Sequence, residues 1–375
     1  MSDRVLCSYK NECSGCQFLD LSYGEQKNLK VQELKDLLEK FSLPFQGEIQ
    51  FHSADVAHLR DRLDFSLLNG NLGLYHKEHR DIVDLDICAQ LSPALQEWLT
   101  EFRRLSWPLE KASFRLRVGP QGQRGAWLDM ANIDVKKILD EKSLLQKLQQ
   151  NSFVEIGQRR KVPALLNDQY KLQDPELQVW FQTWMGEYPV DLYCHVASFT
   201  QPSLRANKLI ASTISRWTKS NAGARVIEFG SGIGNLTFPA LTYAESVTAC
   251  EIDELSLQGL AKTLEFLPES LKHKKEKLKI HRGDFQKKLT QDFSEFDVIM
   301  ANPPRSGLQN FLRPLEELSN EKRPREFIYM SCFPESMVED MQVLDRCGYK
   351  IQELIILDQF PQTKHYEVLT LLQRK

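Results

Sequence analysis

The chain lacks any long apolar run. Nowhere in its 375 residues does an uninterrupted hydrophobic stretch approach the roughly 18 residues that a membrane-spanning helix needs. The opening residues, MSDRVLCSYKNECSGC, also lack the apolar core of a secretory signal. We therefore expect a cytoplasmic, monomeric protein that makes no membrane contact.

The chain also lacks an excess of charge of either sign. Its formal net charge is −3, so the overall charge does not indicate a nucleic-acid-binding protein. Basic clusters occur at Arg159–Lys161 and from Lys272 to Arg282, and each fits a solvated turn as well as a phosphate contact. Any contact with RNA must therefore be local.

Disulfides are not expected, because the cysteines of a cytoplasmic protein stay reduced. Three of the eight cysteines form a C-x5-C-x2-C cluster near the N-terminus, and a fourth candidate lies far along the chain: Cys7, Cys13, Cys16 and Cys88. Four thiolates can hold a [4Fe–4S] cluster or a zinc ion. Structural zinc sites more often have two C-x2-C pairs, and this chain has one. Cys194, Cys250 and Cys347 have no partners at ligand spacing and are expected to be packing residues.

The C-terminal half alternates strand-like and helical segments. Strands are predicted at 225–229, 246–252, 278–284, 296–302 and 326–331, with helices at 254–266, 308–318 and 334–345. Such alternation predicts a parallel sheet with crossover helices. Two more β-rich runs, 349–359 and 365–373, predict an antiparallel pair at the sheet edge. Together they give the seven-stranded, Rossmann-like α/β sheet of S-adenosylmethionine methyltransferases.

The N-terminal half has a different pattern. A helix is predicted at 25–41, and hairpin turns at Asn69-Gly70, Pro120–Gly125 and Gly157–Lys161 predict a mostly antiparallel β domain. We therefore divide the chain into a cysteine segment (1–20), an amphipathic helix (21–49), a central β domain that contains Cys88 (50–193) and a catalytic domain (194–375).

A glycine-rich loop follows the first strand of the predicted parallel sheet. Glycines in Gly230-Ser231-Gly232-Ile233-Gly234 let backbone amides approach a ligand at the carboxyl end of a strand. Nicotinamide cofactors require G-x-G-x-x-G, but Asn235 occupies the last position. With Glu228 before it, the loop matches the E/D-x-G-x-G-x-G pattern of methyltransferases. The candidate cofactor residues in this loop are Glu228, Gly230, Gly232 and Gly234.

Acidic residues end the next two strands. Glu251 lies about 20 residues beyond the loop, where a carboxylate can accept hydrogen bonds from both ribose hydroxyls. Asp284 closes the third strand, where adenine contacts usually arise. Either residue alone could be a helix N-cap. Their positions at the ends of successive strands indicate a site for S-adenosylmethionine.

The fourth strand ends in Asn302-Pro303-Pro304-Arg305. The prolines hold the backbone extended, which aims the Asn302 side chain into the cofactor crevice. Methyltransferases acting on adenine amino groups follow a similar Asn-Pro-Pro with an aromatic residue that stacks on the base. Arg305 takes that position here, which argues against that class.

A cysteine and a carboxylate fall beside the predicted pocket. Carbon 5 of uracil becomes nucleophilic when a thiolate adds to carbon 6, and a base must then remove the carbon-5 proton. Cys332 follows the fifth strand and Glu367 lies on the last. Each alone could be a core thiol or a surface carboxylate, but together they suit this chemistry.

Four motifs resemble the RNA uracil-5-methyltransferase family: YMSC ending at Cys332, NPPRSG starting at Asn302, SFTQ ending at Gln201, and the terminal FPQTKHYEVLTLL. The resemblance covers essentially the whole chain and is closest to the bacterial branch that modifies uridine 747 of 23S ribosomal RNA. It implies that Cys332 is the nucleophile and Glu367 the general base. It also implies that Gln201, Gly230, Glu251 and Asn302 line the S-adenosylmethionine site, with Gln201 near the substrate base as well.

The resemblance also bears on the cysteines. Cys7, Cys13, Cys16 and Cys88 resemble the [4Fe–4S] site of the ribosomal branch, which the best-known bacterial transfer-RNA branch lacks. The chain departs from the family pattern in four places. Phe333 stands where Asn is usual, Gly230 where an aromatic residue is usual, and Gln362 where His is common, and Gln201 is followed by Pro-Ser where x-Asn is usual. These departures bear on cofactor affinity and on the choice of substrate.

The cysteine segment starts at residue 7, which leaves no room before it for the small RNA-binding barrel of the uridine-1939 enzymes. We therefore predict methylation of uridine 747 in 23S ribosomal RNA. The alternatives are an enzyme acting on uridine 54 of transfer RNA and a catalytically silent RNA-binding protein. The Cys–Glu pair argues against the silent protein, which would not need it.

Overall fold

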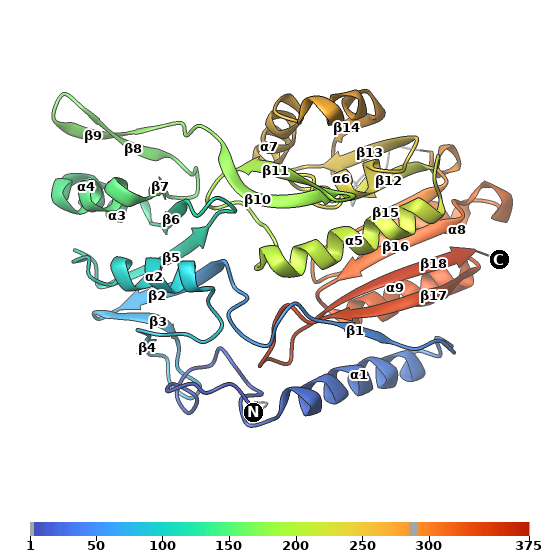
Figure 1. Cartoon of the computed structure of the whole chain (residues 1–375), viewed down its shortest axis with the longest axis horizontal. Helices are drawn as coiled ribbons and strands as arrows, with labels where there is room; N and C mark the ends of the chain where they lie inside the picture. Colours follow the sequence, from blue (N-terminus) through green and yellow to red (C-terminus); the bar gives the residue numbers. More distant parts are fainter. Residues whose placement is uncertain (1–3, 285–291, 375) are drawn as a thin grey trace.

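The computed structural model describes residues 4–284 and 292–374 and contains two large sheets, each flanked by helices (Figure 1). The larger sheet has eight strands in the order β1-β17-β18-β16-β15-β12-β13-β14. Their bounds are β1 (Gln50–His52), β12 (Arg225–Phe229), β13 (Ser246–Glu251), β14 (Leu278–Arg282), β15 (Val298–Ala301), β16 (Glu326–Ser331), β17 (Tyr349–Leu357) and β18 (Glu367–Arg374). Only β18 runs antiparallel to its neighbours. The predicted α/β methyltransferase fold is confirmed.

Two details differ from the sequence expectation. β18 does not lie at the edge but inserts between β16 and β17. β1, which we predicted in the antiparallel β domain, instead pairs in parallel with β17 and makes an eighth strand. It thereby satisfies the backbone groups that β17 would expose as an edge strand.

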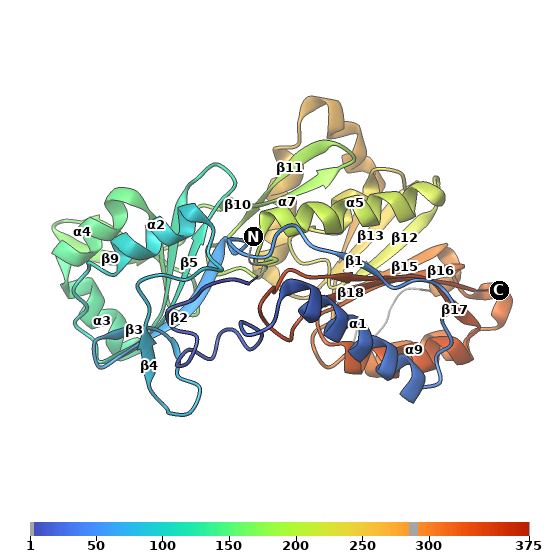
Figure 2. The ribbon, with the colours of Figure 1, turned by 60° about the horizontal axis from the view of Figure 1, so that its bottom comes forward.

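Helices cover both faces of this sheet (Figure 2). One face packs against α5, α6 and α7 in a core that includes Ile210, Phe238 and Leu260. The other face packs against α1 and α9, through residues such as Leu34 and Met337. The helix bounds are α1 (Tyr23–Lys40), α5 (Leu204–Ser220), α6 (Thr237–Leu241), α7 (Glu254–Glu265), α8 (Arg313–Glu317) and α9 (Pro334–Arg346); short 3₁₀ helices span Glu269–Lys277, Phe293–Glu295, Gln309–Leu312 and Asn320–Lys322.

Helix α1 has an unusual buried stripe. It begins with a capping box between Ser22 and Glu25. Its fully buried side chains recur every four positions, which keeps them on one face of the helix; they are Gln26, Lys30, Leu34 and Leu38. The C-terminal half of the stripe is apolar and joins the core, whereas the N-terminal half brings polar groups to the sheet.

The smaller sheet has six strands in the order β4-β3-β2-β5-β6-β7, all antiparallel except the β6–β7 pair. Their bounds are β2 (Arg62–Leu68), β3 (Asn71–Tyr75), β4 (Ile82–Asp84), β5 (Lys111–Val118), β6 (Arg124–Asp129) and β7 (Phe153–Ile156). Asn69 and Gly70 have positive φ, which is the geometry that a two-residue hairpin requires. One face packs on α2 (Pro93–Phe102), α3 (Asn132–Asp140) and α4 (Lys142–Asn151).

Two hairpins complete the chain: β8 (Val162–Leu166) with β9 (Gln169–Gln173), and β10 (Gln178–Met185) with β11 (Tyr188–Cys194). The second hairpin contacts α5, α6 and α7 and contributes Trp180 and Leu192 to the core under the larger sheet. Within the described ranges, no helix is long and apolar enough to cross a membrane.

Candidate active site

Strand register brings Cys332 and Glu367 together. In the antiparallel pair of β16 and β18, Ser331 lies opposite Val368, so the next residue, Cys332, lies opposite Glu367 just beyond the end of β16. The two residues are close enough for the charge of Glu367 to raise the pKa of the Cys332 thiol, in addition to the larger effect of burial. A thiol and a carboxyl group therefore lie side by side where β16 ends and β18 begins.

Glu367 has the electrostatics of a general base that works near neutral pH. Its side chain is only 4% exposed, and this burial raises its pKa to about 8. A hydrogen bond of 3.0 Å from Gln359 Nε2 to Glu367 Oε1 and the positive charge of Arg305 oppose the rise. A carboxyl group in this range can both take up and release a proton at physiological pH.

Arg305 is a candidate functional residue that sequence reasoning did not assign. Its side chain is exposed, and its charge and a hydrogen bond lower the pKa of Cys332 against the larger effect of burial. A guanidinium beside a cysteine favours the thiolate, which is the reactive form. The sequence signal was the Arg after Asn302-Pro303-Pro304, which we used only to exclude adenine methyltransferases.

Gln359 is a second residue that the sequence did not single out. It is fully buried, and its Nε2 donates to Glu367 Oε1 and, at 2.7 Å, to Gln201 Oε1. Gln201 thus joins the same cluster as the two candidate catalytic residues. We call Gln201, Gln359 and Glu367 the amide–carboxylate chain.

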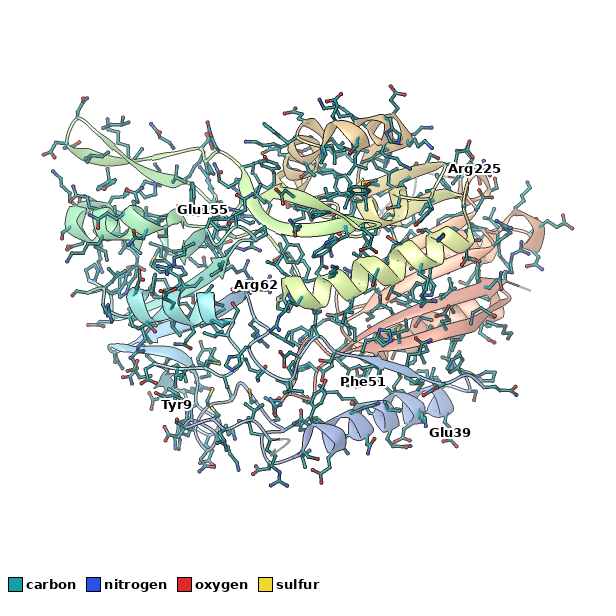
Figure 3. The ribbon with its side chains drawn as sticks, viewed as in Figure 1. Tyr9, Glu39, Phe51, Arg62, Glu155 and Arg225 are labelled. Carbon is teal, nitrogen blue, oxygen red and sulfur yellow. The ribbon has the colours of Figure 1, made fainter. Side chains whose placement is uncertain are left out.

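The loop that carries Gln201 is fixed by arginines of the smaller sheet. Arg62 donates to Thr200 O at 2.7 Å, and Arg117 to Thr200 Oγ1 at 2.5 Å. Arg62 is the first residue of β2 and lies near the start of α5 (Figure 3). In the same loop, the side chain of Phe199 is 70% exposed and packs on the Arg62 guanidinium.

Helix α1 fixes the turn that carries Gln359. Lys30 Nζ lies 2.9 Å from Asp358 Oδ1, and both side chains are buried. Tyr23 donates to the other Asp358 oxygen at 3.1 Å. Gln26 exchanges two hydrogen bonds with Gln362, whose φ is +66°. The polar half of the α1 stripe therefore supports the turn between β17 and β18.

The glycine loop lies where the sequence predicts it. Gly230, Gly232 and Gly234 all have positive φ, a conformation that other residues rarely adopt. A Cβ at Gly232 would meet open space, whereas one at Gly234 would lie 2.8 Å from Leu260 and Phe238. Gly232 thus presents its backbone to an open site, and Gly234 allows close packing beneath it.

The two glutamates around the loop are both buried but differ in their bonding. Glu251 accepts backbone N–H groups from Gly232, Ile252 and Asp253, each at 2.8 Å. Glu228 lies beneath the loop and accepts from Thr237 Oγ1 at 2.5 Å, and burial raises its pKa to about 8. Glu251 therefore shapes the loop through backbone hydrogen bonds, and the raised pKa of Glu228 favours its protonated form at neutral pH.

The remaining candidate cofactor residues lie at the same edge of the sheet. Asn302 directly follows β15, and its carbonyl oxygen lies 3.5 Å from the position of a Cβ on Gly230. Asp284 lies two residues beyond the end of β14 and is half-buried. The carboxyl ends of β12 to β15 thus lie at one edge of the sheet, which is the edge where doubly wound sheets bind ligands.

The four N-terminal cysteines also meet. Cys7, Cys13, Cys16 and Cys88 line one cavity of about 210 Å³. Burial raises the pKa of Cys16 to about 12, and the neighbouring thiols add to this effect. In the described part of the chain, no three His, Cys, Asp or Glu side chains are close enough to hold a single metal ion. A four-iron cluster is larger than one ion and needs thiolates that are further apart.

Two polar groups face this cavity as well. Gln90 lines it, is 5% exposed, and neither end of its amide has a hydrogen-bond partner among the described residues. Arg60 also lines it, and its charge lowers the pKa of Cys16 and Cys88 against the larger effect of burial. An orphaned amide and a cation fit an anionic group bound by four thiolates.

Comparisons with known proteins agree on one family. A family model described as tRNA (Uracil-5-)-methyltransferase matches residues 22–375. An uncharacterized RNA methyltransferase of Bdellovibrio bacteriovorus is 59% identical over 371 residues, covering 99% of this chain and 96% of that protein. The 23S rRNA (uracil(1939)-C(5))-methyltransferase of Shewanella halifaxensis is 25% identical over 392 residues, covering 99% and 82%.

One solved structure resembles the fold over most of its length. It is the tRNA (uracil-54, C5)-methyltransferase of Pyrococcus abyssi in complex with S-adenosyl-L-homocysteine. The TM-score is 0.70 at 19% identity, and the match covers 96% of this chain and 86% of that one. At this identity the likeness concerns the fold.

Proposed function

Because the chain belongs to the tRNA (uracil-5-)-methyltransferase family, we propose that it methylates carbon 5 of a uridine in 23S ribosomal RNA, at position 747. Membership of the family makes it an S-adenosylmethionine-dependent RNA methyltransferase. The relative named as a 23S rRNA enzyme supports a ribosomal substrate. We also propose that the protein acts as a monomer in the cytoplasm.

The proposed reaction uses Cys332 and Glu367 in sequence. S-adenosylmethionine, held around Gly230, Gly232, Glu251 and Asn302, supplies an electrophilic methyl group. The Cys332 thiolate adds to carbon 6 of uracil, and the electron pair displaced toward carbon 5 forms the new bond to the methyl carbon as the sulfur–methyl bond breaks and S-adenosylhomocysteine leaves. Glu367 then takes the carbon-5 proton, the double bond re-forms, and the thiolate leaves.

One observation carries this proposal: a buried carboxyl group with a pKa of about 8 lies opposite a cysteine at the carboxyl edge of the sheet. A base that must be ionised for proton abstraction and protonated afterwards needs a pKa near the working pH.

The direct test is to map 5-methyluridine by mass spectrometry in RNA from a strain in which the gene is deleted. We expect loss of the methyl group at position 747 of 23S ribosomal RNA, with transfer RNA unchanged. Loss of the methyl group at position 1939 would mean that the enzyme modifies a different uridine of the same RNA. Loss at position 54 of transfer RNA would contradict the ribosomal proposal, and unchanged methylation everywhere would favour a silent RNA-binding protein.

We further propose that Cys7, Cys13, Cys16 and Cys88 hold a [4Fe–4S] cluster. The cavity that the four cysteines share and the orphaned Gln90 amide that lines it support this proposal. Protein purified without oxygen should be brown and contain about four iron atoms per chain. Stoichiometric zinc without visible absorbance would overturn the cluster proposal.

A further inference from the structure

One oxygen atom of Asp340 joins two elements that carry the candidate site. Asp340 lies on α9 and is 6% exposed. Its Oδ2 accepts the backbone N–H of Leu308 at 2.7 Å and the hydroxyl of Tyr329 at 2.5 Å. Tyr329 lies on β16, the strand that leads into Cys332. Leu308 directly follows the turn that carries Arg305. A single atom therefore links the strand before the cysteine to the turn with the arginine.

Arg305 lies at the exposed end of this turn. The backbone N–H of Gly307 donates to Pro304 O at 2.9 Å, which closes a four-residue β-turn with Arg305 at its second position. Pro304, Arg305 and Ser306 are exposed, whereas Gly307 is buried. Gly307 has a φ of +75°, and a Cβ there would lie 2.6 Å from Asp340 Oδ2. The turn is therefore attached to the core on its Gly307 side, in direct contact with Asp340.

Strand pairing brings the turn to the cysteine. Ala301 pairs with Tyr329 in the parallel strands β15 and β16, so the segments that follow both strands leave the sheet side by side. Burial and the neighbouring Asp340 raise the pKa of the Tyr329 hydroxyl, which therefore remains a hydrogen-bond donor. Arg305 acts on the Cys332 thiol through a hydrogen bond and its charge. Both effects require the guanidinium to stay within a few ångströms of the sulfur.

We propose that Asp340 is a positioning residue that holds Arg305 beside the Cys332 thiol. This inference rests on the proposed role of Cys332 as the nucleophile. It extends that role by assigning activation of the thiol to a buried residue of α9 that acts through Arg305. Without the Asp340 acceptor, the Leu308 N–H and the Tyr329 hydroxyl lose their common partner. The turn can then move away from the cysteine, and the fraction of reactive thiolate falls.

The test measures the pH midpoint of Cys332 alkylation by iodoacetamide, in enzyme purified without oxygen and in the absence of RNA. The Cys332 peptide is quantified by mass spectrometry, so the other cysteines do not contribute. The midpoint reports the pKa of the thiol, whereas a change in exposure alters the rate at every pH and leaves the midpoint unchanged. The proteins compared are wild type, Asp340→Leu, Arg305→Gln and the double variant. Asp345→Leu is the matched control, because Asp345 lies on the same helix and pairs with Lys350.

We expect Asp340→Leu to raise the midpoint by about one pH unit, the lower end of the effect of a neighbouring opposite charge. Alkylation at pH 7 should then be about tenfold slower, because only the thiolate reacts. Arg305→Gln should raise the midpoint at least as far. Because Asp340 acts through Arg305, the double variant should match Arg305→Gln alone. Asp345→Leu should keep the wild-type midpoint.

A pair of glycine variants tests the same contact without removing Asp340. Gly307 and Gly348 both have positive φ, but the atoms nearest to a Cβ at Gly348 lie 3.6 Å away. Gly307→Ala should push the turn away from Asp340 and raise the alkylation midpoint of Cys332. Gly348→Ala carries the same kind of backbone strain and should leave the midpoint unchanged. The glycine pair decides the question if Asp340→Leu does not fold.

An unchanged midpoint in folded Asp340→Leu, or in Gly307→Ala where Asp340→Leu does not fold, would overturn the proposal. Additive changes in the double variant would overturn it too, since a merely structural effect of Asp340 does not depend on Arg305. If wild type forms no covalent complex with RNA, the proposed role of Cys332 fails. The alkylation midpoints need no RNA and still decide whether Asp340 positions Arg305, so the two failures are distinguishable.

Discussion

Release of the methylated RNA should depend on pH through Glu367 alone. The pKa of this carboxyl group is raised to about 8, so about one-tenth of it is ionised at pH 7 and about one-hundredth at pH 6. If proton abstraction from carbon 5 limits release, the rate should rise about tenfold per pH unit up to pH 7.5 and level off above pH 8.5. Formation of the covalent complex depends on Cys332, so its rate should have a separate dependence on pH.

A pH jump separates the two steps. The covalent complex is formed at pH 6, where release is slow, and is then transferred to pH values from 6 to 9. Its decay is followed on denaturing gels with labelled RNA. Glu367→Gln should decay about 10²–10⁴-fold more slowly than wild type at pH 8 and without pH dependence. Glu353→Gln is the matched control, because Glu353 lies on the neighbouring strand and an Arg216 hydrogen bond lowers its pKa.

The reasoning is refuted if wild-type release is equally fast at pH 6 and pH 9. Such a profile would mean either that Glu367 is ionised throughout, with an ordinary pKa, or that it is not the base. Decay of the Glu367→Gln complex at the wild-type rate would identify the second case.

Three further predictions concern ionisable side chains. Arg305→Gln should slow covalent complex formation and move its rise to higher pH, because Arg305 lowers the pKa of Cys332; an unchanged pH profile of complex formation would contradict this role. Folding raises the pKa of Glu228 to about 8, so the folded state loses stability as pH rises from about 4.5 toward 8. Glu228→Gln should therefore match wild type near pH 5 and unfold at a higher temperature than wild type above pH 8, as calorimetry would measure. Lys30→Met should cost about 3–5 kcal/mol in urea unfolding because it leaves Asp358 buried without its partner, and adding Asp358→Asn should recover part of that loss.

Much of the larger sheet could be predicted from the sequence because its strands are short, apolar and separated by helical patterns. β12 and β16 match the predicted ranges, and α7 and α9 end within one residue of them. β1 could not be predicted in this sheet, since three residues carry too little pattern to choose a partner far along the chain. The packing of the β10–β11 hairpin on α5 likewise depends on tertiary contacts that local periodicity does not encode.

In the candidate site, too, some residues could be predicted from the sequence and others could not. Cys332, Glu367 and the glycine loop were predictable because each lies at the end of a strand whose direction was known. Gln359 was not, because its importance comes from two contacts, one of them with a residue 158 positions away. Nothing in the pattern around Gln359 distinguishes it from a surface glutamine.

Trapping of the covalent complex is the most direct test of the central claim, that Cys332 attacks uracil and Glu367 releases it. Wild type, Cys332→Ala and Glu367→Gln are each mixed with labelled target RNA and S-adenosylmethionine and run on a denaturing gel. We predict a shifted band that persists with Glu367→Gln and no shifted band with Cys332→Ala. A shifted band with Cys332→Ala, or normal turnover without a persistent band with Glu367→Gln, would contradict the account.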